Sequence, residues 1–140
     1  MVIAKSTLRQ DIFSKVYQEV NTVSDPLSRT KQWIFSTLPD FEVNFVGFPI
    51  VIIKKANINK DYELFDNSFS DHTTPITITV YATSNALLDE ISDDIDVVMI
   101  PSNFLQFRFY DYSETDGTTE LGGQKVYFRT MNYFVEVCNL

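Results

Sequence analysis

The sequence predicts an α+β protein, with helices packed on one face of an antiparallel or mixed β-sheet. Two neighbouring patterns lead to this fold class. Apolar and polar residues alternate over residues 76–82, which is the two-residue period of a strand. Apolar residues then recur every three to four positions over residues 85–96, which is the period of a helix. We expect about four to five strands, two main helices and a β-hairpin, all within a single domain of residues 1–140.

The N-terminal part is expected to be helical at first. Over about residues 7–21 the apolar residues form one stripe, and Thr7 and Gln10 have the spacing of a capping box. A second, shorter helix is predicted over residues 27–37, and Pro39 ends it.

Strand patterns begin at residue 41. The run FPIVII, residues 48–53, is apolar throughout, as in a strand that is buried on both faces, and Pro49 belongs at its beginning or on an edge. Residues 54–74 then predict a long polar loop with a short strand around the residues YELF.

Ser84 is the predicted N-cap of the helix over residues 85–96, since a serine hydroxyl accepts hydrogen bonds from the first free N–H groups of a helix. Its acidic residues lie away from the apolar stripe, and we expect a solvated face. The spacing of these acids does not match a calcium-binding loop. They are Asp89, Glu90, Asp93, Asp94 and Asp96.

The C-terminal part predicts the hairpin. Alternating strands over residues 105–112 and 125–137 are joined by a turn-rich segment, in which Gly122-Gly123 is suited to a turn with positive φ. The apolar residues of the last strand change phase near Thr130, which predicts a β-bulge or a change of neighbouring strand there.

The charge of the chain argues against nucleic-acid binding. The net charge is −8, and phosphate groups repel such a chain. An acidic surface is compatible with DNA that passes by without binding. The single cysteine, Cys138, allows no internal disulfide and no cysteine-based metal site.

The sequence holds no recognisable catalytic set. His72 is the only histidine, four glycines cannot build a phosphate-binding loop, and paired acids arise by chance among 19 acidic residues. We therefore expect no enzymatic activity, no metal and no cofactor. Arg108 and Arg129, within the hairpin strands, are expected to pair with acids across the hairpin or to contact a neighbouring subunit.

Nothing in the sequence predicts export or membrane insertion. No stretch of apolar residues is long enough to span a bilayer, and residues 1–10 lack the pattern of a signal peptide. The reducing cytoplasm is the expected place of folding and assembly.

The order of patterns resembles the tail terminator (tail completion) proteins of long-tailed phages and related tailed archaeal viruses. The resemblance rests on an opening helix, TLRQDIFSKVYQEV, the strand FPIVII with a polar loop after it, and a strand that leads into a helix, ITITVYATSNALLDEISDDI. It also includes the aromatic hairpin from LQFRFYDY to KVYFRTMNYFVEV. Residues 22–40, which include Trp33, are more elaborate than this pattern requires.

The resemblance implies a structural virion protein in the tail or neck. Its subunits would form a ring, usually hexameric, on the head-proximal end of the tail tube. Such a ring would end tube growth and join the tail to the head connector, with DNA passing through its lumen. Its partners would be further copies of the chain, the tail tube protein and a head-tail connector or stopper protein.

Subunit contacts are expected in the loop 54–74 and the hairpin tip 111–124. The residues predicted to make them are Lys54, Lys55, Tyr62, Phe65, His72, Arg108, Tyr110, Tyr112 and Arg129. Two other functions stay open at this point. One is another head-tail connector or stopper protein, and the other is a small-ligand regulatory module on a ferredoxin-like fold, with a polar pocket between strand ends and helix starts.

Overall fold

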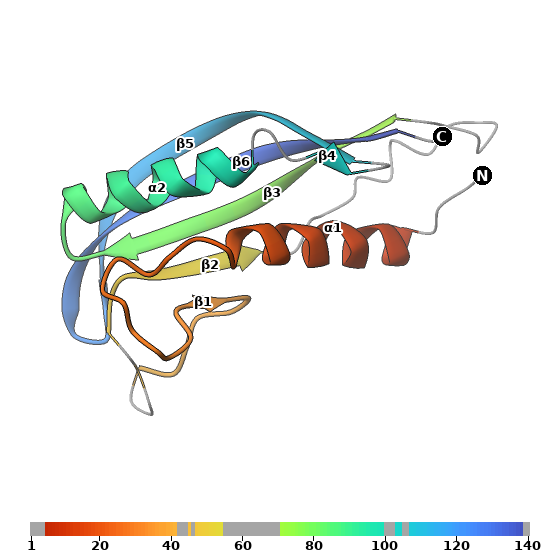
Figure 1. Cartoon of the computed structure of the whole chain (residues 1–140). Helices are drawn as coiled ribbons and strands as arrows, with labels where there is room; N and C mark the ends of the chain where they lie inside the picture. Colours follow the sequence, from red (N-terminus) through yellow and green to blue (C-terminus); the bar gives the residue numbers. More distant parts are fainter. Residues whose placement is uncertain are drawn as a thin grey trace.

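The computed structural model describes most of the chain (Figure 1). The described residues are 5–41, 45, 47–54, 71–99, 103–104 and 107–138. Side chains are described for residues 10, 13–41, 45, 47–54, 76–99 and 113–133. In chain order the elements are α1 (Lys5–Val20), β1 (Ile34–Phe35), β2 (Ile50–Lys54), β3 (Asp71–Ala82), α2 (Asn85–Met99), β4 (Asn103–Phe104), β5 (Phe107–Leu121) and β6 (Gln124–Cys138).

Among the described residues, six strands form one sheet in the order β1-β2-β3-β6-β5-β4 (Figure 1). Strand β1 is parallel to β2, whereas the other neighbouring strands are antiparallel, so the sheet is mixed. Strands β1 and β4 contain two residues each, and the four longer strands make most of the sheet. The predicted α+β fold class is confirmed.

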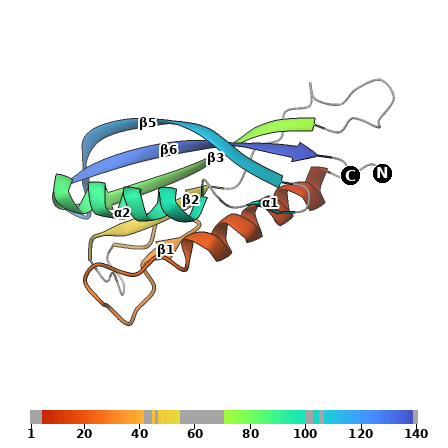
Figure 2. The ribbon, with the colours of Figure 1, turned by 45° about the horizontal axis from the view of Figure 1, so that its top comes forward.

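Both helices cover the same face of the sheet (Figure 2). The alternation in β3 makes this face apolar. Ile76, Ile78 and Val80 are fully buried on it, while Thr77 and Thr79 point to the other face. We call this packing the helix-side core. Its buried apolar members from the helices are Val16, Val20, Leu88, Ile91, Ile95 and Met99.

The opposite face has a smaller apolar cluster near the turn between β5 and β6. Phe48, Ile50 and Val126 are buried there. The rings of Phe41 and Phe45 pack edge to face with centroids 4.7 Å apart, and Phe45 packs against Phe48 at 5.1 Å. Aromatic side chains that precede β2 therefore cover one end of the face that the helices leave open.

Beyond this cluster, polar side chains of β3 and β6 pair with one another on the open face. Thr77 Oγ1 donates a hydrogen bond of 2.8 Å to Asn132 Oδ1. In the next row Thr79 and Thr130 bring their hydroxyl oxygens to 3.4 Å. These cross-strand pairs join β3 to β6 on this face.

Strand β6 supplies apolar residues to both faces, and this explains its change of phase. Val126 belongs to the open-face cluster, whereas Met131 and Tyr133 belong to the helix-side core. The expected irregularity near Thr130 is wrong, since Thr130 pairs regularly with both neighbouring strands. The register shift lies in β5 instead, between Tyr110 and Tyr112.

The predicted helix over residues 27–37 is also wrong. Trp33 and Ile34 are buried in the helix-side core, while the next residue, Phe35, packs against the open-face cluster. Ile34 and Phe35 thus face opposite sides of the sheet, as consecutive residues of a strand do. The carbonyl of Trp33 accepts a hydrogen bond of 2.9 Å from the N–H of Val51, which begins the pairing of β1 with β2.

The turn before β1 is held by the ion pair of Asp25 and Arg29. Asp25 Oδ1 accepts the N–H of Leu27 at 2.9 Å, and Arg29 Nε donates to Asp25 Oδ2 at 2.7 Å. Arg29 also donates to the carbonyls of Gly47 and Pro49, at 2.8 and 2.5 Å. Burial alone would raise the pKa of the Asp25 carboxyl, but the hydrogen bonds from Arg29 and Leu27 outweigh it and lower the pKa.

The other elements agree with the sequence except at their ends. Helix α2 continues to Met99, and Ser84 is its N-cap, with its Oγ 3.3 Å from the N–H of Leu87. Residues 71–74, predicted as loop, are part of β3. Strand β5 extends through the predicted connection to Leu121, so the turn is Gly122-Gly123 alone. Residues 42–44, part of the strand predicted from 41, and the predicted strand at 62–65 lie outside the described residues.

Candidate assembly surface

The described part of the chain contains neither a candidate metal site nor a candidate membrane-spanning helix. No three of the described His, Cys, Asp or Glu side chains are placed to hold a metal ion. No helix in the described part of the chain is long and apolar enough to cross a membrane.

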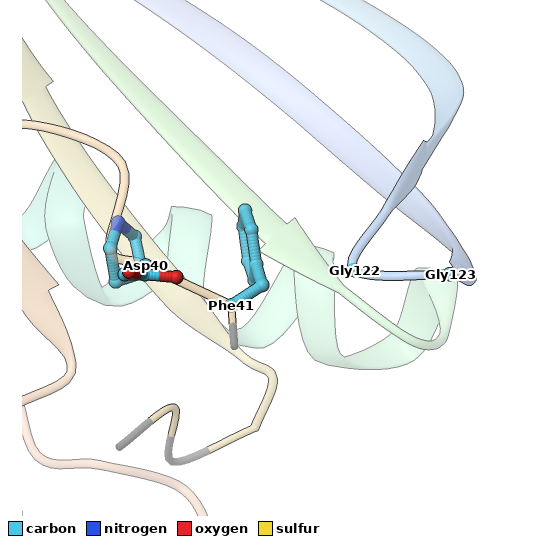
Figure 3. Close-up of a pocket in the computed structure, with 5 residues that line it drawn as sticks. Asp40, Phe41, Gly122 and Gly123 are labelled. Carbon is cyan, nitrogen blue, oxygen red and sulfur yellow. The ribbon is translucent and has the colours of Figure 1, made fainter. Parts of the chain in front are cut away.

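A hollow of about 530 Å³ lies beside the turn of the hairpin and is lined by Pro39, Asp40, Phe41, Gly122 and Gly123. Figure 3 shows Asp40 and Phe41 on one side of it and the two glycines on the other. A Cβ atom at Gly122 would meet Phe41 at 3.2 Å. Among the described residues of this lining, Asp40 is the only one with an ionisable side chain, so they offer no pair of groups for acid–base chemistry.

The two longest strands described are those of the hairpin, β5 and β6, with 15 residues each. One side of β5 pairs with β6 over the whole hairpin. On its other side, the described residues that pair with β5 are Asn103 and Phe104, which reach only Arg108 and Phe107. We call residues 109–121 the β5 edge. Their outward N–H and C=O groups form an edge at which another strand can add.

Arg129 connects the hairpin to helix α2. Its Nε and Nη2 donate to the two carboxylate oxygens of Asp116 on β5 at 2.8 and 3.0 Å, and Nη2 lies 2.9 Å from Asp89 Oδ1 on α2. The pairing across the hairpin that the sequence allowed for Arg129 is therefore present. The hydrogen bonds from Arg129 lower the pKa of the Asp116 carboxyl, and the same contacts raise the pKa of the Arg129 guanidinium.

Tyr133 is a second connection between β6 and α2. Its ring is buried in the helix-side core, and its hydroxyl donates to Asp96 Oδ1 at the border of that core. One of the five acids on α2 is thus an internal acceptor. Among the other four, Asp89 binds Arg129, and all four are exposed, as the sequence predicts.

Gly117 allows close packing in the middle of the hairpin. It is paired with Phe128, whose ring lies so near that a Cβ atom at Gly117 would come within 2.6 Å of Phe128 Cζ. Phe128 in turn lies beside Tyr81, with ring centroids 6.1 Å apart. The glycine therefore lets the ring of Phe128 lie close against β5 while it also packs beside Tyr81 of β3.

The predicted contact residues are spread over several elements. Lys54 is exposed at the end of β2, and Arg129 is in β6 as described above. His72 lies in β3, and Arg108, Tyr110 and Tyr112 lie in β5, all placed by their backbone. Lys55, Tyr62 and Phe65 lie outside the described residues.

Sequence reasoning missed Asp116, Asp89 and Gly117 as partners in the hairpin. A signal for Asp116 was present, because a two-residue turn at Gly122-Gly123 sets Asp116 opposite Arg129 by counting back along both strands. No comparable local signal brings Asp89 to the same place, since it depends on how α2 packs on the sheet.

Comparisons with known proteins give a structural match only. No family model matches the sequence, and no curated protein matches it. The fold is similar to that of a chain in a solved structure titled "Virion of native gene transfer agent (GTA) particle", with a TM-score of 0.57. The match covers 86% of this chain and 91% of that chain at 9% sequence identity, and it therefore shows a shared fold.

Proposed function

We propose that this protein is a structural component of a virus-like particle, and that it forms a ring at the head-proximal end of a tail tube. The observation that carries the proposal is the shared fold with a chain of a gene transfer agent virion over nearly the whole length of both chains. The order of sequence patterns, which resembles tail terminator proteins, supports the same function.

Ring formation fits the features of the surface. No three of the described His, Cys, Asp or Glu side chains are placed to hold a metal ion, whereas β5 presents an edge that can pair with another chain. In a ring each subunit uses two different surfaces, one for each neighbour. A stable contact of this kind buries about 1,000 Å² or more in total.

In the proposed assembly the ring ends growth of the tail tube and receives the head connector, while DNA passes through its lumen. The net charge of −8 supports passage without binding, because like charges repel the DNA backbone. The protein would act by shape, without enzymatic activity or a cofactor, in the tail or neck of a virion assembled in the host cytoplasm.

The position in the particle is the direct test. Particles that contain this chain are disrupted, free tails are separated from heads, and the chain is located by labelled antibody in electron micrographs. Label at one end of free tails is the expected result. Label on heads alone would mean that the protein is a head-side connector and not a tail terminator. Absence of the label from both fractions would contradict the proposal.

Self-association gives a second test on the purified protein. Light scattering and electron microscopy should show closed rings at moderate concentration, or rings that form when tail tubes are added. Monomers that ignore tail tubes, combined with a melting temperature raised by a metabolite, would favour the regulatory module instead.

A further inference from the structure

Charge is unevenly distributed across the sheet. The described residues among 5–54, which include α1, β1 and β2, hold six Lys and Arg against four Asp and Glu, a net charge of +2. The described residues among 71–138, which include α2, β5 and β6, hold three Lys and Arg against eleven Asp and Glu, a net charge of −8. Strands β1 and β5 lie toward opposite edges of the sheet, and α2 packs on β3 and β6 between them (Figure 1). Among the described residues, the segment that contains β1 is therefore positive, and the segment that contains α2 and β5 is negative.

The negative edge is the β5 edge. Glu114, Asp116 and Glu120 lie on one face of this strand, and all three are exposed. Only Asp116 takes part in a described salt bridge, with Arg129. The backbone of residues 109–121 is unpaired on the outer side among the described residues. A strand or loop that docks here would complete hydrogen bonds and neutralise acids.

The positive edge is the β1 side, which we define as residues 27–38 together with Lys54. Lys31 and Lys54 are exposed on it. Two of the three exposed large apolar side chains found among the described residues, Leu27 and Leu38, are also here, at 54% and 48% exposure. Exposed apolar side chains beside exposed cations are typical of a surface that is covered in an assembly.

We infer that neighbouring copies pack in a head-to-tail manner, which means that the β5 edge of one copy lies against the β1 side of the next. Two β5 edges facing one another in antiparallel pairing would oppose acids with acids, which is unfavourable. The head-to-tail arrangement joins unlike charges and uses two different surfaces, so it continues from copy to copy until a ring closes. This inference rests on the proposed function and names the surfaces through which the ring would form.

Charge reversal tests the pairing of these two surfaces. The first variant is Glu114→Lys with Glu120→Lys on the β5 edge, and the second is Lys31→Glu with Lys54→Glu on the β1 side. Each variant alone would set like charges together, and we expect about tenfold weaker association or more, measured by light scattering. An equal mixture of the two should assemble again, because alternating copies then present opposite charges at every contact.

A matched control carries the same change of charge elsewhere. Asp93→Lys with Asp94→Lys alters two exposed residues of α2 and should leave association within about twofold of the unchanged protein. An equal loss in this control, or no recovery in the mixture of folded variants, would overturn the assignment. Circular dichroism establishes whether each variant is folded. If the double variant on the β5 edge does not fold, the single substitution Thr118→Lys adds a positive charge to the same edge and replaces it in the test.

A crosslinking experiment gives a second readout. In a background of Cys138→Ser, Thr118→Cys and Lys31→Cys are prepared as separate chains and treated with a flexible bis-maleimide. Dimers should appear when the two chains are mixed, and a ladder of larger species when one chain has both cysteines. Dimers from Thr118→Cys alone would show edge-to-edge pairing and overturn the head-to-tail arrangement.

The outcomes separate this inference from the proposed function. If the unchanged protein forms rings and the charge-reversed variants form them equally well, the inferred contact surfaces are wrong, but the proposal of a ring still holds. If the unchanged protein associates neither alone nor on tail tubes, the proposed function fails, and the head-to-tail contact fails with it.

Discussion

Arg129 joins β6 to β5 and to α2 by hydrogen bonds to two carboxylates, while its own side chain is only 14% exposed. Asp89 and Asp116 are 64% and 53% exposed, so water weakens both ion pairs. The arginine is still specific in its geometry, because a planar guanidinium can bind two carboxylates in fixed directions and a lysine cannot. Arg129 therefore sets the position of the hairpin against the helix.

Replacement of Arg129 by methionine should lower the free energy of unfolding by about 1 kcal/mol, since two partly exposed ion pairs are lost and the buried stem is kept. Urea unfolding measures the change. Lys125→Met, at an exposed position on the same strand, is the control and should have little effect. Equal stability of the two variants would mean that the contacts of Arg129 contribute nothing.

Helix α2 is held at its start by Ser84 and packed on the sheet by its apolar stripe. Its sequence pattern predicts both properties. Ser92, which is 2% exposed, is an exception within the buried stripe, because its hydroxyl has no hydrogen-bond partner among the described residues. A buried hydroxyl without a partner destabilises a fold.

The two serines should respond in opposite ways to the same substitution. Ser92→Ala removes an unpaired buried hydroxyl and should raise the free energy of unfolding by about 1 kcal/mol. Ser84→Ala removes the N-cap and should lower it by about 1 kcal/mol. Thermal and urea unfolding check both values, and a destabilised Ser92→Ala protein would reveal that this hydroxyl is satisfied in solution.

The turn of the hairpin offers another matched pair. Gly122 and Gly123 both have positive φ, at 58° and 77°, so alanine is strained at either position. Only at Gly122 would the new Cβ also press on Phe41, at 3.2 Å, whereas nothing lies within 4 Å at Gly123. Gly122→Ala should therefore be more destabilising than Gly123→Ala, by about 1 kcal/mol in urea unfolding. Equal effects would place Phe41 away from the turn in solution.

At the scale of the whole molecule, one sheet carries apolar residues on both faces, and helices cover only one of them. Ion pairs fasten the parts that lie outside the main core, with Arg29 holding the segment before β2 and Arg129 holding the hairpin. The carboxylates in these pairs, Asp25 and Asp116, have lowered pKa values, so folding depends on their being ionised.

Stability should consequently fall in acid. Because both folded-state pKa values lie below the ordinary value of 3.8, the stabilisation is complete well above that pH and is lost as the pH falls through it. Urea unfolding between about pH 6 and pH 2.5 should show this loss. The Arg129→Met protein should show a smaller dependence, and an identical pH profile would remove Asp116 from the explanation.

Local periodicity was sufficient to predict the type of the elements that pack directly into the core. Strands β2, β3 and β6 and helices α1 and α2 all follow their predicted patterns. Residues 27–37 could not be predicted in this way, because Trp33 and Ile34 have a spacing that suits a helix, while pairing with β2 and the contacts of Arg29 draw them into a strand. Tertiary contacts therefore determined the conformation of this segment.

The extension of β5 was hidden for a different reason. Residues 113–121 are polar and lack an apolar alternation, so they read as a connection, although β6 pairs with every one of them. The candidate assembly surface could not be predicted from local sequence patterns either. Its acids could be counted from the sequence, but an unpaired edge is a property of the complete sheet and appears only when the neighbours of each strand are known.

The contact between Gly117 and Phe128 has a consequence for how this sequence can change over evolutionary time. The aromatic ring occupies the space where any other residue would carry its first side-chain atom. Relatives of this protein should therefore keep glycine at position 117 whenever position 128 is aromatic, and should lose both together. A collection of such sequences in which the two positions vary independently would contradict this expectation.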